Sequence, residues 1–553
     1  MKNLDLQTAE RCLNSSKMRF EGLITKNEFD YVTIELGREP NDFELHLFSA
    51  TYSEHCSYKH SKELLKLLPR EGAIFTDENA GGIEIGEHAI LFKMESHNHP
   101  CAVEPFNGAA TGIGGIIRDV LAMNARPIAL CNSLKFGSNK RIIKGVVEGI
   151  SVYGNSIGVP TVSTEVLIDE CFTENPLVNV TAIGLAKKSD ILQANTAKSG
   201  LKLMLVGSAT MRDGMGGAAF ASKELSDEKA EDKISIQIAN PFMKKKLIEA
   251  CLEIFSKKLV VSCQDCGAAG ILSSTSEVAF KSGCGVEVDL SKIHLGDKLI
   301  KDFEIMLSET QERMLFVVEE SKIGEIRKIL KKYQLESSII GDTTDEKKYI
   351  VKNGDKIMAE IPSWLLVTPP EIELNFKNVE NKFGSNPVNG NGPQIYTQYD
   401  HTVGARTQYQ PTIYPSPQPS PARGEGVIPN ACIPQFNSLW IYEEKCFVGI
   451  YSFCAVIKNK PFKEVFDSII NAAEFIKEQG FVPAGMTNCL NFANPDIAPT
   501  MYQFKETILA IKKACKELNI PICSGNVSFY NESSSSKIKN TPTFTMIGIK
   551  YSK

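Results

Sequence analysis

The sequence predicts a mixed α/β (α+β) protein that is built around a duplicated domain. Three observations lead to this fold class. Two segments repeat the same motifs in the same order, each segment alternates short β-rich runs with helical stretches, and the chain of 553 residues is too long for one hydrophobic core. A composition of 42% hydrophobic and 23% charged residues is typical of globular proteins. We expect about three or four domains.

Four motifs carry the repeat. In the first copy they are HNHP (97–100), NSLKF (132–136), GVPTVSTEVLI (158–168) and VTAIGL (180–185). In the second copy the same order gives KNKP (458–461), NCLNF (488–492), NIPICSGNVSF (519–529) and FTMIGI (544–549). Because a repeat constrains the architecture before any motif is interpreted, a duplicated domain is the economical explanation.

The pattern of apolar residues predicts the individual elements. In the first copy, strands are expected at AILFKM (89–94), ARPIALCNSL (125–134), PTVSTEVLI (160–168) and VNVTAIGLA (178–186), and a helix at IIRDVLAM (116–123). In the second copy, YQFKETILAIKKACKEL (502–518) predicts a helix. Between the copies we expect strands at KLMLVG (202–207) and LFVVEE (315–320) and helices at 240–258 and 322–333.

The two copies differ in the segments on their C-terminal sides. The expected organisation is a first N-terminal-type domain over 1–187, a C-terminal-type domain over 188–368, a linker over 369–395 and a second N-terminal-type domain over 396–553, with a low-complexity insertion at 411–429. No counterpart of 188–368 comes after the second copy. We therefore expect the second half to be incomplete, with the final C-terminal-type domain absent and an apolar face left uncovered.

Charge and cysteine content exclude several classes of protein. A net charge of −5 argues against a nucleic-acid partner or an anionic membrane surface. Fifteen cysteines without even spacing, and an N-terminus without an apolar leader, indicate reduced thiols and a cytoplasmic location. No apolar run approaches the roughly 18 residues of a membrane span.

Acidic residues and histidines cluster where strands end. Glu95 ends the run AILFKM, and Asp265 follows the apolar run KLVVS. GAATGIGG (108–115) is expected to be a loop that leads into a helix whose first turn holds Arg118 and Asp119, so that its N-terminus is open to an anion. Glu95, Asp119 and Asp265 are hard oxygen ligands suited to Mg²⁺ bound with a polyphosphate.

Other interpretations of these residues are weaker. Asp119 also fits a residue whose charge interacts with a helix dipole, and Asp265 also fits a turn residue. His97 and His99 are spaced to share a zinc ion, but no further Cys or His pair at metal spacing lies nearby. GMGGAA (214–219) matches a dinucleotide fingerprint, yet six residues separate it from the preceding strand. No Walker-type phosphate loop occurs.

Nine motifs in order resemble one enzyme family. They are SEHCSYK (53–59), ESHNHP (95–100), GAATGIGGIIRD, YGNSIGVPTVSTEV, QDCGAAG, SETQERML (308–315), YDH (399–401), NCLNFANP and SGNVSFYNES (524–533). Together they resemble the synthetase subunit of multi-subunit phosphoribosylformylglycinamidine synthase. The resemblance implies a duplicated aminoimidazole-ribonucleotide-synthetase-like ATP-binding fold. It also implies ATP-dependent conversion of formylglycinamide ribonucleotide and ammonia to the amidine, the fourth step of de novo purine synthesis.

The resemblance also implies roles for individual residues. His55 and His97 would be catalytic, with His97 as the proton acceptor. ATP would contact Tyr58, Lys93, Asn488 and Gly525, and Mg²⁺ would contact Glu95, Asp119, Asp265 and Asn526. The substrate would contact Ser96, His97, Asn98, His99, Arg118, Gln237, Glu309, Thr310, Gln311 and Ser528. A glutaminase subunit and a small bridging subunit would be partners.

The second copy departs from the family pattern. Where the family has an Asp-Ala-Ala-type stretch this chain has NAC (430–432), and IYSFCAVIKNKP (450–461) lacks the arginine of the corresponding family segment. These departures motivate an alternative, a catalytically impaired remnant that binds nucleotide or partner subunits. Aminoimidazole ribonucleotide synthetase itself is disfavoured because it has one copy of the domain and lacks SEHCSYK.

Overall fold

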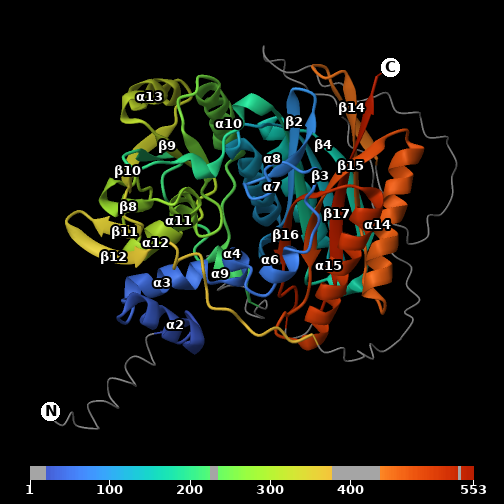
Figure 1. Cartoon of the computed structure of the whole chain (residues 1–553), viewed down its shortest axis with the longest axis horizontal. Coiled ribbons are helices and arrows are strands. Elements are labelled where there is room, and N and C mark those ends of the chain that lie inside the picture. Colours follow the sequence, from blue (N-terminus) through green and yellow to red (C-terminus); the bar gives the residue numbers. More distant parts are fainter. Residues whose placement is uncertain (1–19, 224–234, 377–435, 534–536, 553) are drawn as a thin grey trace, which may run out of the picture.

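The computed structural model describes residues 20–223, 235–376, 436–533 and 537–552, which form three β-sheets with helices packed against them (Figure 1). Most of the expected linker, the expected insertion at 411–429 and the motifs YDH and NAC lie outside the described residues. In the described part of the chain, no helix is long and apolar enough to cross a membrane.

The first copy forms a five-stranded sheet with helices on one face. The strand order is β1 (Gly81–Ile85), β2 (His88–Ser96), β5 (Leu177–Lys187), β3 (Arg126–Phe136) and β4 (Thr161–Ile168). The helices are α6 (Asn98–Val103), α7 (Pro105–Ala122) and α8 (Lys140–Ile157). Only the β3–β4 pair is parallel, and the other neighbours run antiparallel.

The second copy forms a sheet of the same topology. Its order is β13 (Asn437–Ile441), β14 (Cys446–Cys454), β17 (Thr541–Tyr551), β15 (Val482–Asn491) and β16 (Ile522–Ser528), with helices α14 (Pro461–Glu478) and α15 (Ala498–Leu518). The registers also match, because Asn132 pairs with Val180 while Asn488 pairs with Phe544. The predicted duplication and the α/β fold class are therefore confirmed.

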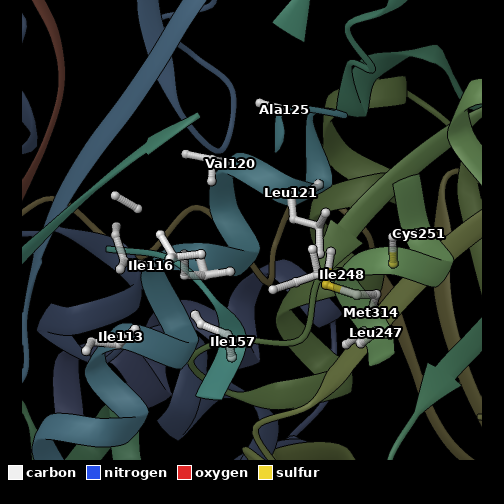
Figure 2. Packing of buried hydrophobic residues seen from close by; sticks show 14 of the residues in the cluster. Ile113, Ile116, Val120, Leu121, Ala125, Ile157, Leu247, Ile248, Cys251 and Met314 are labelled. Atoms are coloured by element: carbon white, nitrogen blue, oxygen red, sulfur yellow. The ribbon is translucent and has the colours of Figure 1, made fainter. Parts of the chain in front are cut away.

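The middle of the chain forms a seven-stranded sheet. Its order is β12 (Lys356–Pro362), β11 (Lys348–Asn353), β8 (Gly285–Asp289), β10 (Glu336–Thr344), β6 (Lys202–Gly207), β9 (Arg313–Val318) and β7 (Ser262–Asp265). Its helices are α9 (Gly217–Phe220), α10 (Pro241–Ser256), α11 (Gly270–Ser282), α12 (Asp302–Leu307) and α13 (Ile323–Lys332). Figure 2 shows that α10 and β9 pack on α7 and α8 of the first copy, so one continuous core joins the two units.

In the described part of the chain, from residue 20 onward, four short helices precede the first sheet. They are α2 (Lys26–Leu36), α3 (Asp42–Thr51), α4 (Glu54–Ser57) and α5 (Lys62–Leu65). Buried residues of α2 and α3, including Val32 and Phe48, share a core with the middle sheet rather than with the sheet of the first copy. The expected boundary at 187 assigns these helices to the first copy, but they pack on the middle sheet. The expected domain boundaries stay a prediction.

One motif pairing made from the sequence is wrong. The repeat pairs HNHP with KNKP, but Pro461 opens α14 as Pro105 opens α7. The residues before these prolines, Glu104 and Lys460, have closely similar backbone angles. The short helix α6, which contains most of HNHP, has no counterpart in the second copy among the described residues.

The expected loop at GAATGIGG is also wrong, because the whole run lies inside α7, which begins three residues earlier at Pro105. The glycines permit close packing instead of anion binding. A Cβ at Gly108 would lie 2.6 Å from the carbonyl carbon of Pro100, and one at Gly112 would lie 3.0 Å from His97 Cβ. Arg118 and Asp119 consequently sit near the buried C-terminal end of α7.

The sheets of the two copies face each other across a shared apolar core. Buried side chains from both sheets meet there, including Ile90 and Phe92 of β2 and Ile450 and Ile547 of the second copy. The backbones come closest at Gly81, where a Cβ would lie only 1.8 Å from the carbonyl oxygen of Cys523. Glycine is thus required for β1 to lie against β16.

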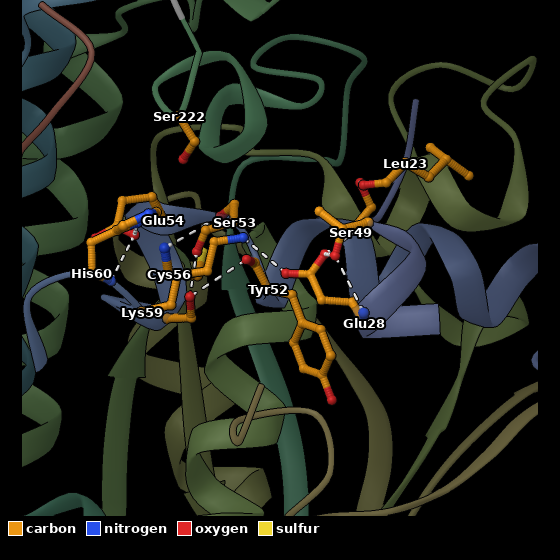
Figure 3. Close-up of polar contacts among 12 residues, drawn as sticks. Leu23, Glu28, Ser49, Tyr52, Ser53, Glu54, Cys56, Lys59, His60 and Ser222 are labelled. Carbon is orange, nitrogen blue, oxygen red and sulfur yellow. Dashed lines mark hydrogen bonds and ion pairs between the residues drawn. The ribbon is translucent and has the colours of Figure 1, made fainter. Parts of the chain in front are cut away.

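A buried histidine ties the N-terminal helices to the second copy. His60 Nδ1 lies 2.6 Å from Glu54 Oε2 (Figure 3), and Nε2 lies 3.2 Å from Asp496 Oδ1. Burial alone lowers the pKa of His60, but the hydrogen bonds to Asp496 and Glu54 outweigh it and raise the pKa to about 9. The charged imidazole therefore holds α4 against the loop at 494–496.

The close approach at Gly81 predicts a stability effect. We expect Gly81→Ala to lower the free energy of unfolding by roughly 1–3 kcal/mol, because the added methyl group overlaps backbone atoms that cannot move aside. Gly324→Ala is the matched control: that glycine lies in α13 with no atom within 4 Å of the added carbon. We expect it to be neutral or slightly stabilising. Chemical denaturation of both variants measures the difference, and equal midpoints would contradict the packing argument.

The His60 clamp predicts a pH effect. Because the folded-state pKa is raised, its stabilisation is fully present below about pH 6.5 and is lost as pH rises through about 9. We expect the wild-type chain to lose on the order of 2 kcal/mol over this window, allowing for screening of the exposed Asp496. His60→Gln should lack this component. Denaturation midpoints from pH 6 to 9.5 test it, and parallel curves for the two proteins would rule it out.

Candidate functional site

A cavity of about 180 Å³ lies where the two copies meet. The four residues predicted to bind ATP line it, together with Asn526, which was predicted to bind magnesium. These residues converge because β2 of the first copy packs against β15 and β16 of the second, while Tyr58 arrives from the C-cap of α4. The structure thus brings together residues from four segments, as a group predicted from the sequence: Tyr58, Lys93, Asn488, Gly525 and Asn526.

Hydrogen bonds and one glycine shape this cavity. Tyr58 Oη donates to Asn526 Oδ1 at 2.9 Å, and Asn526 Nδ2 donates to Ser96 Oγ at 3.1 Å. A Cβ at Gly525 would lie 2.7 Å from Asn488 Oδ1, so a larger residue would displace that amide. The buried Asn488 Nδ2 has no partner among the described residues, which leaves a donor available to a bound molecule.

Lys93 sits between two of the predicted metal-binding carboxylates. Its Nζ lies 3.0 Å from Glu95 Oε1 and 3.2 Å from Asp119 Oδ1. Burial raises the pKa of Asp119, and the charges of Glu95 and Asp265 raise it further. The nearby Lys93 lowers this pKa but does not outweigh burial. A cation bound beside these residues would relieve their mutual repulsion.

The third predicted carboxylate is held differently. Asp265 ends β7, and its Oδ2 lies 3.4 Å from Arg118 Nε. Among the described residues, no three His, Cys, Asp or Glu side chains lie close enough together to hold a metal ion by themselves. The donor set therefore fits a cation that takes part of its coordination from a bound phosphate rather than one enclosed by protein.

A second, smaller cavity of about 20 Å³ adjoins the first, and both are lined by Val527. Five residues predicted for catalysis or substrate binding line the smaller cavity: His55, Ser96, Asn98, His99 and Ser528. His55 is placed by its main-chain N–H, which donates to Ser222 Oγ at 2.9 Å. Burial lowers the pKa of His55.

Two residues of the smaller cavity are tied into the protein itself. Asn98 donates to Asn491, Ser528 and Asn531 of the second copy, and its Oδ1 accepts from the N–H of Val178. His99 Nε2 lies 3.0 Å from the carbonyl oxygen of Tyr530. Both side chains therefore join the copies whatever contact they make with a substrate.

The environment of His97 fixes its tautomer. Nδ1 lies 2.6 Å from the carbonyl oxygen of Gly108, so this nitrogen must carry the proton. Nε2 is then the basic nitrogen of the neutral ring. Burial lowers the pKa of His97 to about 4, so the ring is neutral near pH 7 and can accept a proton.

The remaining predicted substrate residues form one cluster beside α7. Gln311 Nε2 donates to Thr111 O at 2.8 Å and to Gln237 Oε1 at 2.7 Å, and Gln237 in turn donates to Glu309 Oε2 at 3.0 Å. Burial raises the pKa of Glu309 to about 7. These residues are linked with one another and reach α7 close to His97, but they line neither cavity.

Two further predicted residues belong to this cluster at its edge. Thr310 Oγ1 donates to Asp213 Oδ1 at 2.8 Å, and an Arg118 guanidinium nitrogen donates to the carbonyl oxygen of Gln311. Arg118 is almost completely buried, and its Nε has no hydrogen bond in the described structure. Arg118 therefore holds this segment through its main chain, and among the buried side-chain atoms of 308–311 only Gln311 Oε1 has no partner in the described residues.

The sequence did not reveal several residues that shape the site. Arg313 is fully buried and donates to the carbonyl oxygens of Ser308 and Thr310. Lys244 is also fully buried and bonds to Gly114 and Gln311. In the sequence Arg313 merely precedes an apolar run and Lys244 begins a KKK run, so both have the pattern of exposed charges.

The symmetry-related position carries different residues. The register places Tyr451 and Phe453 of β14 where β2 has Lys93 and Glu95. Glu165 of β4 occupies the position of Asn526 and forms a 2.8 Å ion pair with the fully buried Lys135. The duplicated scaffold thus presents the residues predicted for nucleotide on one side only.

Comparisons with known families agree with this arrangement. The chain matches the family described as AIR synthase related protein, N-terminal domain, at residues 77–186 and 457–550, and the corresponding C-terminal domain at 198–353. Residues 14–59 match the formylglycinamide ribonucleotide amidotransferase linker domain. The first of these families matches twice, as the duplicated sheets require.

Curated relatives are similar over most of the chain. The phosphoribosylformylglycinamidine synthase subunit PurL of Petrotoga mobilis is 42% identical over 95% of this chain and 73% of its own length. That of Thermoanaerobacter sp. is 40% identical over 95% of this chain and 74% of its own.

Solved structures give the same result. Thermotoga maritima PurL complexed with FGAR superposes with a TM-score of 0.80 at 34% identity, covering 95% of this chain and 83% of that one. The complex of the same protein with ATP has a TM-score of 0.75 at 31% identity, covering 95% and 82%. The sequence relatives, the superposed structures and the twice-matched domain agree: this chain belongs to the PurL family of phosphoribosylformylglycinamidine synthase subunits.

Proposed function

We propose that this chain is an ATP-dependent carbon–nitrogen ligase of purine biosynthesis. It converts formylglycinamide ribonucleotide, ammonia and ATP to formylglycinamidine ribonucleotide, ADP and phosphate. The observation that carries this proposal most directly is the adjacency of the two cavities. Residues predicted for ATP line one, His55 and four residues predicted for the substrate line the other, and Val527 lines both.

The reaction proceeds through an activated amide. The amide oxygen of the substrate attacks the γ-phosphorus of ATP, and ADP leaves with the electrons of the broken P–O bond. Ammonia then adds to the carbon of this iminophosphate, and phosphate leaves with the former amide oxygen. Activation is required because an unmodified amide oxygen is a poor leaving group.

His97 is assigned the proton transfer. Ammonia must lose a proton after it adds to the carbon, and Nε2 of His97 is the basic nitrogen of a neutral, buried ring. His55 shares the smaller cavity with Ser96 and Ser528 and is the second catalytic candidate. Asn98, His99, Arg118, Gln237 and the segment 309–311 are proposed to bind and orient the substrate.

Magnesium is proposed to enter with the nucleotide. Glu95, Asp119, Asp265 and Asn526 would supply oxygen ligands, completed by phosphate oxygens. When bound, the ion neutralises charge that develops on the transferred phosphoryl group. Lys93 adds a positive charge at the same place, between Glu95 and Asp119.

Family membership supports a proposal for the nitrogen donor and for the location. We propose that a glutaminase subunit supplies ammonia, that a small bridging subunit joins the assembly, and that the chain is cytoplasmic. One similar solved structure is described as PurLQS from Thermotoga maritima, with a TM-score of 0.77 at 31% identity over 95% of this chain and 83% of that one. The impaired-remnant alternative is not favoured, because both copies contribute the predicted residues to one cavity.

The proposed reaction predicts a strict dependence on substrates. Purified chain should release phosphate only when formylglycinamide ribonucleotide, ammonium, ATP and Mg²⁺ are all present, and amidine should form in equal amount. Glutamine should not replace ammonium unless the partner subunits are added. Coupled phosphate assay and mass spectrometry of the product measure both. ATP hydrolysis that ignores the ribonucleotide would reject the assignment.

The roles proposed for Asp119 and His97, which line neither cavity, predict different kinetic effects for two substitutions. Asp119→Asn should weaken ATP binding and lower kcat/KM for ATP by about 10²-fold, on the order of 3 kcal/mol. His97→Ala should lower kcat by roughly 10²–10⁴-fold with ATP affinity near wild type, because only proton transfer is lost. Asp342→Asn, which breaks a surface pair with Lys202, is the control and should behave as wild type. Small, equal effects of the first two would contradict these roles.

A further inference from the structure

A fully buried lysine joins the middle unit to the first copy at the edge of the site. Lys244 lies on α10, and its Nζ donates to the carbonyl oxygen of Gly114 at 3.1 Å and to that of Gln311 at 3.3 Å. Gly114 lies in α7, and Gln311 belongs to the segment that precedes β9. One ammonium group thus bridges two segments that come from units built on different sheets.

Keeping a lysine in this position costs free energy. Its side chain has no exposed surface, and burial together with the nearby charge of Arg118 lowers the pKa of Lys244 to about 7. The apolar residues of the same helix, such as Leu247 and Ile248, show that an apolar side chain fits this core. The ammonium group therefore provides hydrogen bonds that a methionine of similar shape would not make.

The contacts of Gln311 show what that contribution is. Its carbonyl oxygen is held by both Lys244 and Arg118, while its side-chain amide reaches Thr111 O and Gln237. Its Oε1 is buried and has no partner in the described structure. Holding the main chain from two sides fixes the direction of this amide without using its side-chain groups.

The hydrogen bond from Gln311 to Thr111 also places segment 309–311 against α7, the helix that orients His97. Thr111 and Gly108 lie on one side of α7, and Gly108 O is the acceptor for His97 Nδ1. A shift of Gln311 would therefore move the amide cluster relative to that ring. A displacement of about 1 Å in such a positioning contact is enough to cost on the order of 10²-fold in rate.

We infer that Lys244 is a positioning residue for the reaction, which holds the substrate-binding segment 309–311 in register with α7 and so with His97. This inference rests on the proposed function for the identity of the substrate. The nucleotide cavity lies elsewhere and contains no residue of that segment. The effect of losing Lys244 should consequently fall on the ribonucleotide and not on ATP.

The carbonyl oxygens that Lys244 holds keep other partners when it is removed. Gly114 O remains within the hydrogen-bonding pattern of α7, and Gln311 O still accepts from Arg118. Lys244→Met removes the cost of burying this ammonium, but it also removes the attraction of Lys244 for the buried Glu312 carboxyl, whose pKa burial raises. We therefore expect this variant to fold with a thermal midpoint close to that of wild type, whereas a purely structural role would lower it.

Steady-state kinetics of Lys244→Met provide the first test. We expect the KM for formylglycinamide ribonucleotide to rise at least tenfold and kcat to fall, with the KM for ATP within twofold of wild type. Lys245→Met is the matched control, since Lys245 is the next residue of α10 and pairs only with Glu249 at the surface in the described structure. If wild type is active and Lys244→Met has the same KM for the ribonucleotide as wild type, the inference is overturned.

Hydrogen exchange gives a second test that does not depend on the substrate. Peptides that cover 305–316 should exchange faster in Lys244→Met than in wild type or Lys245→Met, while peptides from 522–529 should not change. Equal exchange in 305–316 would overturn the inference even if the wild type showed no turnover. An inactive wild type with the expected exchange difference would instead reject the proposed function and leave the positioning contact standing.

Discussion

The face-to-face packing of the two duplicated sheets is the constraint on which the site depends. Each copy alone presents an open face of apolar side chains, and the two faces bury one another. This packing brings the end of β2 to β15 and β16, so that residues more than 390 positions apart, such as Met94 and Thr487, are in hydrogen-bond contact. Loss of this interface would remove the larger cavity, since its walls come from both copies.

Buried cationic side chains that donate to main-chain carbonyl oxygens are a second feature that organises the site. Arg118, Lys244 and Arg313 come from different elements, and all three donate to carbonyl oxygens of the segment 308–311. Carbonyl oxygens can accept two hydrogen bonds, so the cations hold the backbone without competing for the side chains. A segment that is proposed to bind substrate and lacks regular secondary structure is in this way made rigid.

The sequence predicted the repeat, the strands and ten of the residues that line the two cavities, because these depend on local patterns and ordered motifs. It misplaced the start of α7, because glycines usually interrupt helices and nothing local shows that Gly108 and Gly112 pack against Pro100 and His97. The roles of Lys244 and Arg313 were also hidden. Their environment is created by segments distant in sequence, and burial of a charge has no periodic signal.

Covalent fusion of two similar sheets has a consequence for how their residues can diverge. In a symmetric dimer of separate chains, every substitution at the interface occurs twice, and both edges of the contact must tolerate it. Here Lys93 and Glu95 on one edge correspond to Tyr451 and Phe453 on the other, and Asn526 corresponds to Glu165. One copy is thus free to keep polar groups and open space, while at the equivalent positions of the other there are aromatic rings that pack into the core of the second copy and a closed ion pair.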